Sequence, residues 1–139
     1  MGTRHARPRH NRRRRVIVLD TGALIGIEKR DARTAALIQA AIHARQRITL
    51  PATVLGQAWR NSSRQHPLTR LLAADGLHIA DLDRRHALAI GALLAASGTT
   101  DVVDAHVIVC ARATRATTII TSDPDDLRQL DPTIPLTVV

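Results

Sequence analysis

The sequence alternates between short runs of β-branched and aliphatic residues and longer stretches with apolar residues at helical spacing. The short runs predict strands at residues 16–20, 47–50, 77–80, 117–121 and 135–139. The stretches between them predict helices, among them one over residues 52–63 and one that opens at Pro67 and ends at Gly76. Alternating strands and helices predict a three-layer α/β/α domain with a mostly parallel sheet of about five strands. Pro135 places the last strand at an edge.

The positive charge of the chain is concentrated at its beginning. Residues 1–15 hold seven of the 20 Lys and Arg residues and no acid, which leaves 13 basic residues against 12 acidic ones in the rest. We expect a disordered arginine-rich arm over residues 1–15 and one folded domain over residues 16–139. Three interpretations of the arm remain open: it contacts RNA phosphates, it contacts an acidic partner surface, or it reflects a mis-assigned translation start.

Composition disfavours several classes of protein. The single cysteine, Cys110, excludes an internal disulfide and a zinc site made of cysteines, and it is typical of a reducing cytoplasm. No apolar run approaches the ~20 residues that a membrane-spanning helix needs. Because the chain has no Phe or Tyr, RNA binding by aromatic stacking is also disfavoured. The seven histidines show no paired ligand spacing, so His106 and Cys110 are interpreted as structural residues.

Four aspartates occupy positions where a parallel sheet binds ligands. Asp20 ends the first predicted strand, Asp123 follows the fourth, and Asp101 and Asp104 open the helix that leads into the fourth. If the first and fourth strands are neighbours, the four carboxylates converge at the carboxyl ends of the strands. Acids so close together repel one another unless protons or a cation occupy the site. Oxygen ligands without His or Cys favour Mg²⁺ or Mn²⁺ over zinc.

Each of these aspartates also has an interpretation as a helix cap. Asp123 can cap the helix that follows it, with Asp126 as the reciprocal acid of a capping box. Asp101 can cap its helix, with Asp104 favourable to the helix dipole. Asp20 fits this interpretation least well, because a carboxylate at the end of a buried strand is costly without a partner.

Three segments, "VIVLDTGALI", "TTDVVDAH" and "TSDPDDL", resemble in this order the motifs of a PIN domain, and most of all those of an actinobacterial VapC-type toxin ribonuclease. The resemblance spans residues 16–139. It implies a Mg²⁺- or Mn²⁺-dependent endoribonuclease, a toxin of a type II toxin–antitoxin system, with a cognate VapB-type antitoxin and a homodimeric assembly. By position, Asp20, Asp104 and Asp123 match the acids that hold the metal in this family, and Asp101 matches a further catalytic acid.

The resemblance extends to three supporting positions. Thr21 and Ser122 fall where the family often keeps a hydroxyl beside an acid. Gln57 stands where the family commonly has a glutamate, which removes one negative charge from the site. We expect Arg60, one turn after Gln57 on the same helical face, to contact a flanking phosphate, unless it is a solvated helix arginine.

Two rival functions are considered beside the ribonuclease. Because Gln57 replaces an acid, the main alternative is a catalytically degenerate PIN-like module that binds RNA or protein. A phosphatase with Asp20 as nucleophile is disfavoured, because Gly22 occupies the position of the second aspartate that this chemistry usually needs.

Overall fold

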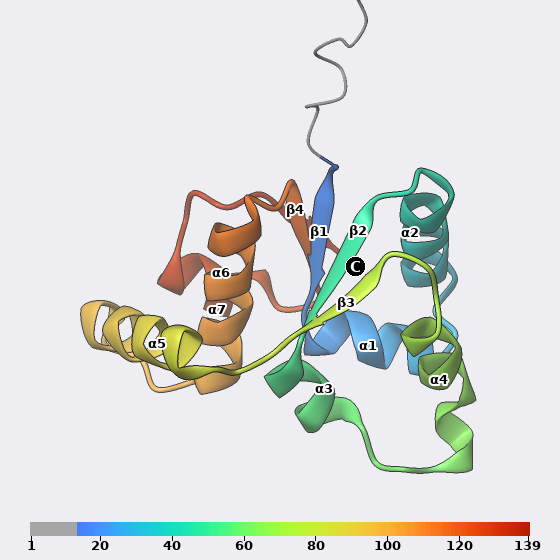
Figure 1. Cartoon of the computed structure of the whole chain (residues 1–139), viewed down its shortest axis with the longest axis horizontal. Helices are drawn as coiled ribbons and strands as arrows, with labels where there is room; N and C mark the ends of the chain where they lie inside the picture. The colour runs from blue at the N-terminus through green and yellow to red at the C-terminus, as the bar shows by residue number, and fades with distance from the viewer. Residues whose placement is uncertain (1–13) are drawn as a thin grey trace, which may run out of the picture.

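A five-stranded parallel sheet forms the centre of the computed structural model, which describes residues 14–139 (Figure 1). The strands are β1 (Val16–Leu19), β2 (Arg47–Pro51), β3 (Leu77–Ala80), β4 (Thr118–Thr121) and β5 (Leu136–Val138). Their order in the sheet is β3-β2-β1-β4-β5, and every neighbouring pair is parallel. The first and fourth strands are thus neighbours, which was the condition for the four carboxylates to converge, and the prediction that the last strand is an edge is confirmed.

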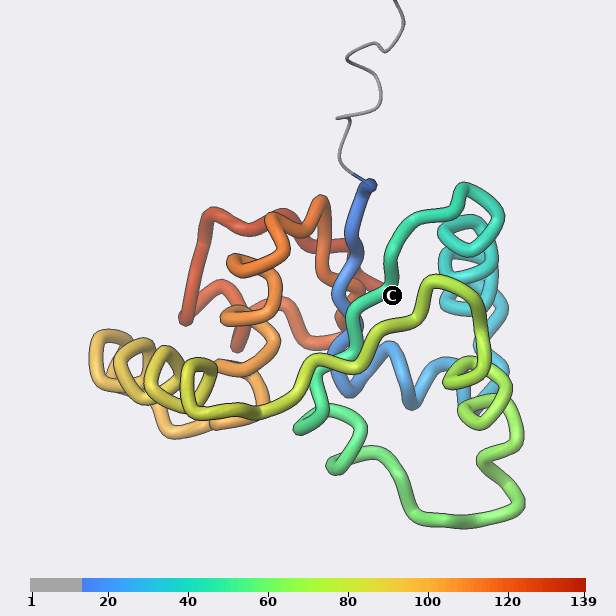
Figure 2. Tube along the Cα trace, viewed as in Figure 1, coloured from blue at the N-terminus to red at the C-terminus, as the bar shows by residue number. Residues whose placement is uncertain are grey.

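Helices cover both faces of this sheet. They are α1 (Thr21–Glu28), α2 (Ala32–His43), α3 (Ala52–Ala58), α4 (His66–Leu72), α5 (Arg84–Ser97), α6 (Val102–Thr114) and α7 (Pro124–Leu130), with a short 3₁₀ turn, η2 (Ser63–Gln65). In Figures 1 and 2, α1, α2 and α4 lie on one side of the sheet and α5, α6 and α7 on the other, with α3 near the carboxyl ends of the strands. The predicted three-layer α/β/α fold is confirmed. Within residues 14–139, no single helix is long and apolar enough to cross a membrane; α5 and α6 meet that test of length and composition only as a pair bent by 111°.

The core is built on β1 and α6. All four residues of β1 are buried, because the strand lies between β2 and β4 and is covered on both faces. In α6, residues 105–111 are all buried, which is the pattern of a helix enclosed on every side. The first turn of α6 therefore has a fixed position relative to the end of β1.

Two predicted helix boundaries are wrong. The helix predicted over residues 52–63 stops at Ala58, because the buried side chain of Gln65 replaces the next helical hydrogen bonds. Gln65 Nε2 donates to the carbonyl of Ala58 at 2.8 Å, and its Oε1 accepts from the backbone N–H of Arg60 at 2.7 Å. The helix predicted to end at Gly76 stops at Leu72 instead, where hydrogen bonds three residues apart tighten the chain into a turn.

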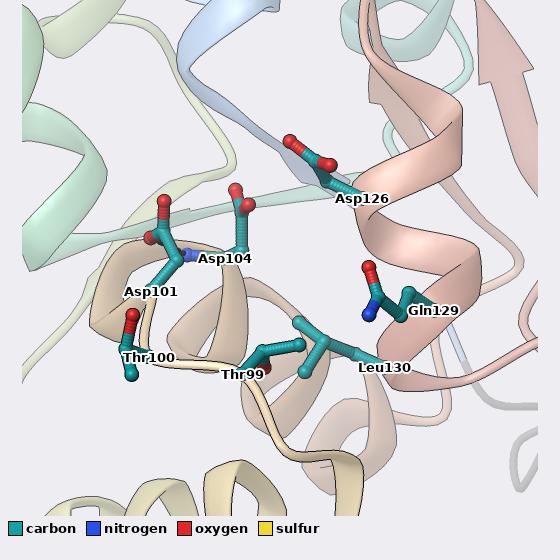
Figure 3. Close-up of a pocket in the computed structure, with 7 residues that line it drawn as sticks. All are labelled: Thr99, Thr100, Asp101, Asp104, Asp126, Gln129 and Leu130. Carbon is teal, nitrogen blue, oxygen red and sulfur yellow. Dashed lines mark hydrogen bonds between the residues drawn. The ribbon is translucent and has the colours of Figure 1, made fainter.

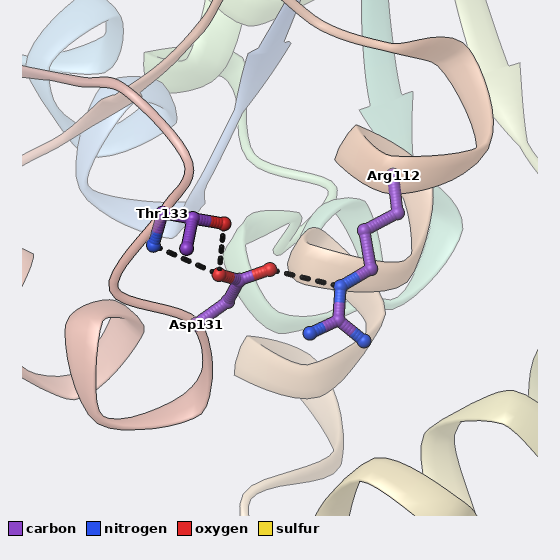
Figure 4. Close-up of polar contacts among 3 residues, drawn as sticks. All are labelled: Arg112, Asp131 and Thr133. Carbon is purple, nitrogen blue, oxygen red and sulfur yellow. Dashed lines mark hydrogen bonds and ion pairs between the residues drawn. The ribbon is translucent and has the colours of Figure 1, made fainter.

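An ion pair between a buried aspartate and a half-exposed arginine attaches the last segment of the chain to α6 (Figure 4). Arg112 Nε donates to Asp131 Oδ2 at 2.9 Å. The other carboxylate oxygen of Asp131 accepts from the backbone N–H of Thr133 at 2.9 Å and from its hydroxyl at 2.6 Å. Asp131 is 7 % exposed, so these bonds satisfy a carboxylate that would otherwise be buried at a high cost. The contact fixes the turn between α7 and β5.

The predicted arginine arm falls largely on residues 1–13, which lie outside the described residues. Its last two residues contact the start of the sheet. Arg14 Nε donates to the carbonyl of Arg45 at 2.7 Å, and the carbonyl of Arg15 accepts from the N–H of Arg47 at 2.9 Å. The boundary of the arm stays a prediction.

We expect Gly22→Ala to destabilise the fold, because a Cβ at Gly22 would lie 2.0 Å from the Oγ of Ser122 and 3.0 Å from its backbone nitrogen. Overpacking of this kind costs about 1–3 kcal/mol. Gly91→Ala is the matched control, since its Cβ would meet nothing within 4 Å and alanine is favoured inside a helix by about 0.5–1 kcal/mol. Urea unfolding of both variants measures the difference, and an unchanged Gly22→Ala would contradict the close approach of α1 to the loop after β4.

Candidate active site

Asp20 lies at the junction of β1 and α1, at the carboxyl end of the sheet. The register pairs Leu19 with Ile120, so Asp20 lies beside Thr121, and its N–H donates to the Ile120 carbonyl at 3.2 Å. Asp20 also caps α1, because its Oδ1 accepts from the N–H of Ala23 at 3.2 Å. The expectation that Asp20 would resist the cap interpretation is therefore wrong: the residue is 6 % exposed and is a cap as well.

The acid pair at the start of α6 faces the same region. Asp101 caps the helix as predicted, with its Oδ1 accepting from the N–H of Asp104 at 2.9 Å. Figure 3 shows the carboxylates of Asp101 and Asp104 beside each other at the edge of an open cleft of about 230 Å³. Asp126, on α7, lines the same cleft from the other side. The cleft therefore lies between the start of α6, with the loop before it, and the face of α7 that carries Asp126, Gln129 and Leu130.

The capping box predicted for α7 is absent from the structure. Asp123 precedes α7, but its side chain accepts no capping hydrogen bond, and its own N–H donates to the Thr121 hydroxyl at 2.9 Å. Asp126 therefore does not bond back to that N–H. Instead, a hydrogen bond with Asp123, and then the charge of that residue, raise the pKa of Asp126. Sequence reasoning missed Asp126 as a member of the acid cluster, although its i, i+3 spacing from Asp123 repeats that of Asp101 and Asp104.

The pKa values indicate how closely these acids are grouped. Burial, which has the largest effect, and then the charges of Asp101, Asp126, Asp20 and Asp123 together raise the pKa of Asp104 to about 6. Burial also raises the pKa of Asp20, and the charge of Asp123 raises it too. The hydrogen bonds that Asp20 accepts lower the pKa, but by less. The structure thus brings together the four predicted aspartates and Asp126. We call these five residues the acid cluster.

The donor atoms of the acid cluster are of the chemical kind that a hard cation takes. Neither of the two salt bridges within residues 14–139 involves one of its members: they join Arg112 to Asp131 and Arg128 to Asp125. Carboxylates that repel one another, without a basic partner among the described residues, are stabilised by protons or by a bound cation. Oxygen-only ligands suit Mg²⁺ or Mn²⁺. This donor set satisfies the chemical requirement of the cation expected from the sequence.

Three of the predicted supporting residues lie beside the acid cluster. Thr21 Oγ1 donates a hydrogen bond to Gln57 Oε1, which joins the first residue of α1 to α3. Gln57 is exposed, so its amide remains accessible from solvent. Ser122 follows β4 and packs against Gly22, whose missing side chain lets α1 approach this loop. Thr21 and Ser122 are thus chain neighbours of Asp20 and Asp123, and Gln57 is joined to them through Thr21.

Arg60 does not lie where the sequence predicted it. Because α3 ends at Ala58 and Trp59 is extended, Arg60 is not on the helical face of Gln57. Its Nη1 donates to the carbonyl of Trp59 at 2.8 Å, and the side chain is exposed. The contact of Arg60 with a phosphate stays a prediction. It was suggested because Arg60 and Gln57 were expected on one helical face, and they are not.

Three solved structures have the same fold. VapBC2 from Rickettsia felis, bound to a promoter DNA fragment, is 18 % identical with a TM-score of 0.64, and the match covers 89 % of this chain and 98 % of that one. DNA-bound VapBC from Salmonella typhimurium is 18 % identical with a TM-score of 0.60, and the match covers 89 % of this chain and 98 % of that one. FitAcB from Neisseria gonorrhoeae is 17 % identical with a TM-score of 0.60, and the match covers 86 % of this chain and 95 % of that one. At this identity the likeness shows the fold alone. Comparison with curated protein sequences gave no significant match.

The family is shown by the sequence itself. The model of the PIN domain matches residues 17–131, which include β1, the start of α6 and the loop after β4, and hence all five residues of the acid cluster. This match covers most of the chain and agrees with the confirmed α/β fold. The chain belongs to the PIN domain family.

Proposed function

We propose that this chain is a metal-dependent endoribonuclease, the toxin of a type II toxin–antitoxin system. The observation that carries the proposal is the acid cluster, in which Asp104 has a pKa of about 6 and no described basic group forms a salt bridge with any member. Its position at the carboxyl ends of β1 and β4 is where parallel α/β sheets bind ligands. Membership of a family of nucleases supports the same reaction.

In this proposal Asp20, Asp104 and Asp123 hold a Mg²⁺ or Mn²⁺ ion. The bound ion supplies charge neutralisation for the scissile phosphate and activates water for hydrolysis. Asp101 positions Asp104 by capping α6 through its N–H. Asp126, which faces them from α7, adds negative charge to the same cleft.

Four further residues support this site. Thr21 orients Gln57 through their hydrogen bond, so that the amide offers a neutral ligand or donor at the edge of the cluster. Ser122 packs against Gly22 and so fixes the loop that carries Asp123. Arg60, exposed beyond the end of α3, contacts a flanking phosphate of the RNA.

The partners are part of the same proposal. Two of the solved structures of the same fold are VapBC2 and VapBC bound to DNA, and the third is FitAcB. We extend this assembly to the present chain: a VapB-type antitoxin covers the toxin, the toxin forms a homodimer, and it acts on RNA in the cytoplasm. Placement in the actinobacterial subgroup rests on the resemblance of the three sequence motifs alone.

A degenerate PIN-like module that binds RNA or protein without cleaving it is the second candidate. Gln57 is the observation that favours it, because an amide at this position leaves the cluster one carboxylate short of the common family pattern. Asp126 offsets that loss, since it brings a carboxylate into the cleft from α7. Metal-dependent cleavage of RNA by the full-length chain separates the two candidates.

Asp104→Asn should lower the rate of RNA cleavage by about 100-fold or more, because it removes a charged ligand from the cation. Asp125→Asn is the matched control: Asp125 lies next to Asp126 but points to solvent and pairs with Arg128. Cleavage of labelled RNA in Mg²⁺, with calorimetric titration of the cation on the same samples, measures both effects. Equal activity of the two variants would place the cation elsewhere.

The contribution of Asp104 to the stability of the cation-free protein should fall as the pH rises from about 4 to about 6. Burial, followed by the charges of Asp101, Asp126, Asp20 and Asp123, raises the pKa of Asp104 to about 6 from 3.8, so the folded state holds this proton more tightly than the unfolded chain does. The extra stability is fully present below the pKa that Asp104 has in the unfolded chain. It is lost as the pH rises through the pKa that Asp104 has in the folded protein. Urea unfolding in EDTA measures how the free energy of unfolding changes with pH, and Asp104→Asn should make this change smaller. An identical pH dependence in the variant and the wild type would rule out the raised pKa.

Gln57→Glu should increase Mg²⁺ affinity by about tenfold, because it restores one negative charge at the edge of the cluster while Thr21 can still donate to the new carboxylate. Gln39→Glu, on the exposed face of α2, controls for the change in net charge. Calorimetry on both variants gives the comparison. If neither substitution changes the affinity, Gln57 does not act on the cation.

A further inference from the structure

A second group of metal-ligand side chains lies behind the acid cluster. His86, His106 and Cys110 each offer one ligand atom, and these three atoms all lie within 4.8 Å of one another. The rings of the two histidines are already in contact, since His86 Nδ1 and His106 Nε2 are 3.0 Å apart. Sequence reasoning missed the group, because it treated His106 and Cys110 as core residues and gave no weight to their i, i+4 spacing on one helical face.

The group joins α5 to α6. His86 lies in the first turn of α5, where its N–H donates to Asp83 Oδ1 at 2.9 Å. His106 and Cys110 lie one turn apart on α6 and are 0 % and 1 % exposed. His86 is half-buried, so the group is open to solvent from the side of α5. The same two helices pack against each other in Figure 1.

One ring of this group is oriented by a neighbour. His106 Nδ1 lies 2.8 Å from the hydroxyl of Thr53, at the start of α3. When the proton is on Nδ1 and is donated to Thr53, the lone pair of Nε2 faces His86. A ligating histidine usually has its other nitrogen held in this way, which fixes its tautomer and ring orientation.

The distances suit a tetrahedral cation. With metal–nitrogen bonds of ~2.0–2.1 Å and a metal–sulfur bond of ~2.3 Å, ideal tetrahedral angles place two nitrogens ~3.3 Å apart and a nitrogen and a sulfur ~3.6 Å apart. The two ring nitrogens, 3.0 Å apart, are close to the first value. Since all three ligand atoms lie within 4.8 Å of one another, the sulfur must move closer to a nitrogen by at most about 1.2 Å, which side-chain rotation can supply.

We propose that His86, His106 and Cys110 bind a thiophilic divalent cation of the Zn²⁺ class, at a site separate from the acid cluster. Three protein ligands leave a fourth position for water on the open side of His86. The cation connects the first turn of α5 to the middle of α6. The proposal does not depend on nuclease activity, because none of its ligands belongs to the acid cluster.

The chemistry of the ligands separates the two sites. Two imidazoles and a thiolate favour Zn²⁺ or Co²⁺, whereas carboxylates favour Mg²⁺ or Mn²⁺. Burial raises the pKa of the Cys110 thiol to about 12, so the thiol keeps its proton in the metal-free protein. The proton passes to solvent when the thiolate binds the cation. A hard ion such as Mg²⁺ binds sulfur too weakly to displace the proton of the Cys110 thiol.

Cobalt titration of the untagged full-length chain tests the site, because Co²⁺ bound to a thiolate gives a charge-transfer absorption band in the near ultraviolet. Cys110 is the single cysteine of the sequence, so the band reports this site even if Co²⁺ also binds the acid cluster. We expect a saturable band that Zn²⁺ removes and excess Mg²⁺ leaves in place. Asp104→Asn should keep the band, since it alters only the acid cluster.

The variants separate ligation from structure. Cys110→Ala should abolish the band, and His86→Ala should weaken Co²⁺ binding by about tenfold or more. His78→Ala, which changes an exposed histidine on β3, should leave binding unchanged. Circular dichroism checks the fold, and the half-buried His86 provides a decisive variant if Cys110→Ala does not fold. Absence of the band in the folded wild type, or equal affinity in His86→Ala, would overturn the proposal.

Discussion

The burial of β1 between β2 and β4 is the constraint on which the rest of the structure depends. A strand that is covered on both faces and paired on both edges has no freedom to shift, so Asp20 at its end has a fixed position. Parallel strands end at the same edge of a sheet, and this brings the loop after β4 to Asp20. The enclosed helix α6 then places Asp101 and Asp104 at the same edge.

Structural and functional interpretations of these aspartates are compatible. Asp20 and Asp101 each cap a helix while belonging to the acid cluster. The starts of α1, α6 and α7 meet here, and the positive ends of the helix dipoles partly offset the repulsion between the carboxylates. The offset is incomplete, because burial and the neighbouring charges still raise the pKa of Asp104 to about 6. The remaining repulsion is what a bound cation would relieve.

Helix α6 carries two sets of ligands with different chemistry. Asp104, in its first turn, faces the open cleft, whereas His106 and Cys110 turn towards α5 and the core. Residues two apart on a helix point in different directions, so neighbouring side chains can serve separate environments. The hydroxyl of Thr53 on α3 contacts one set, and Gln57, one turn later on α3, lies beside the other.

The sequence by itself determined the strands, the positions of most helices and the places of four aspartates, because periodicity and strand ends are local properties. The tertiary structure alone decided where α3 ends, since that depends on Gln65 bonding to Ala58 and Arg60. It also decided that Asp126 bonds to the side chain of Asp123 and not to its backbone N–H, because that N–H donates to the Thr121 hydroxyl. His86 meets His106 and Cys110 only when α5 packs on α6. Contacts between residues far apart in sequence leave no local pattern, and so they required the folded chain.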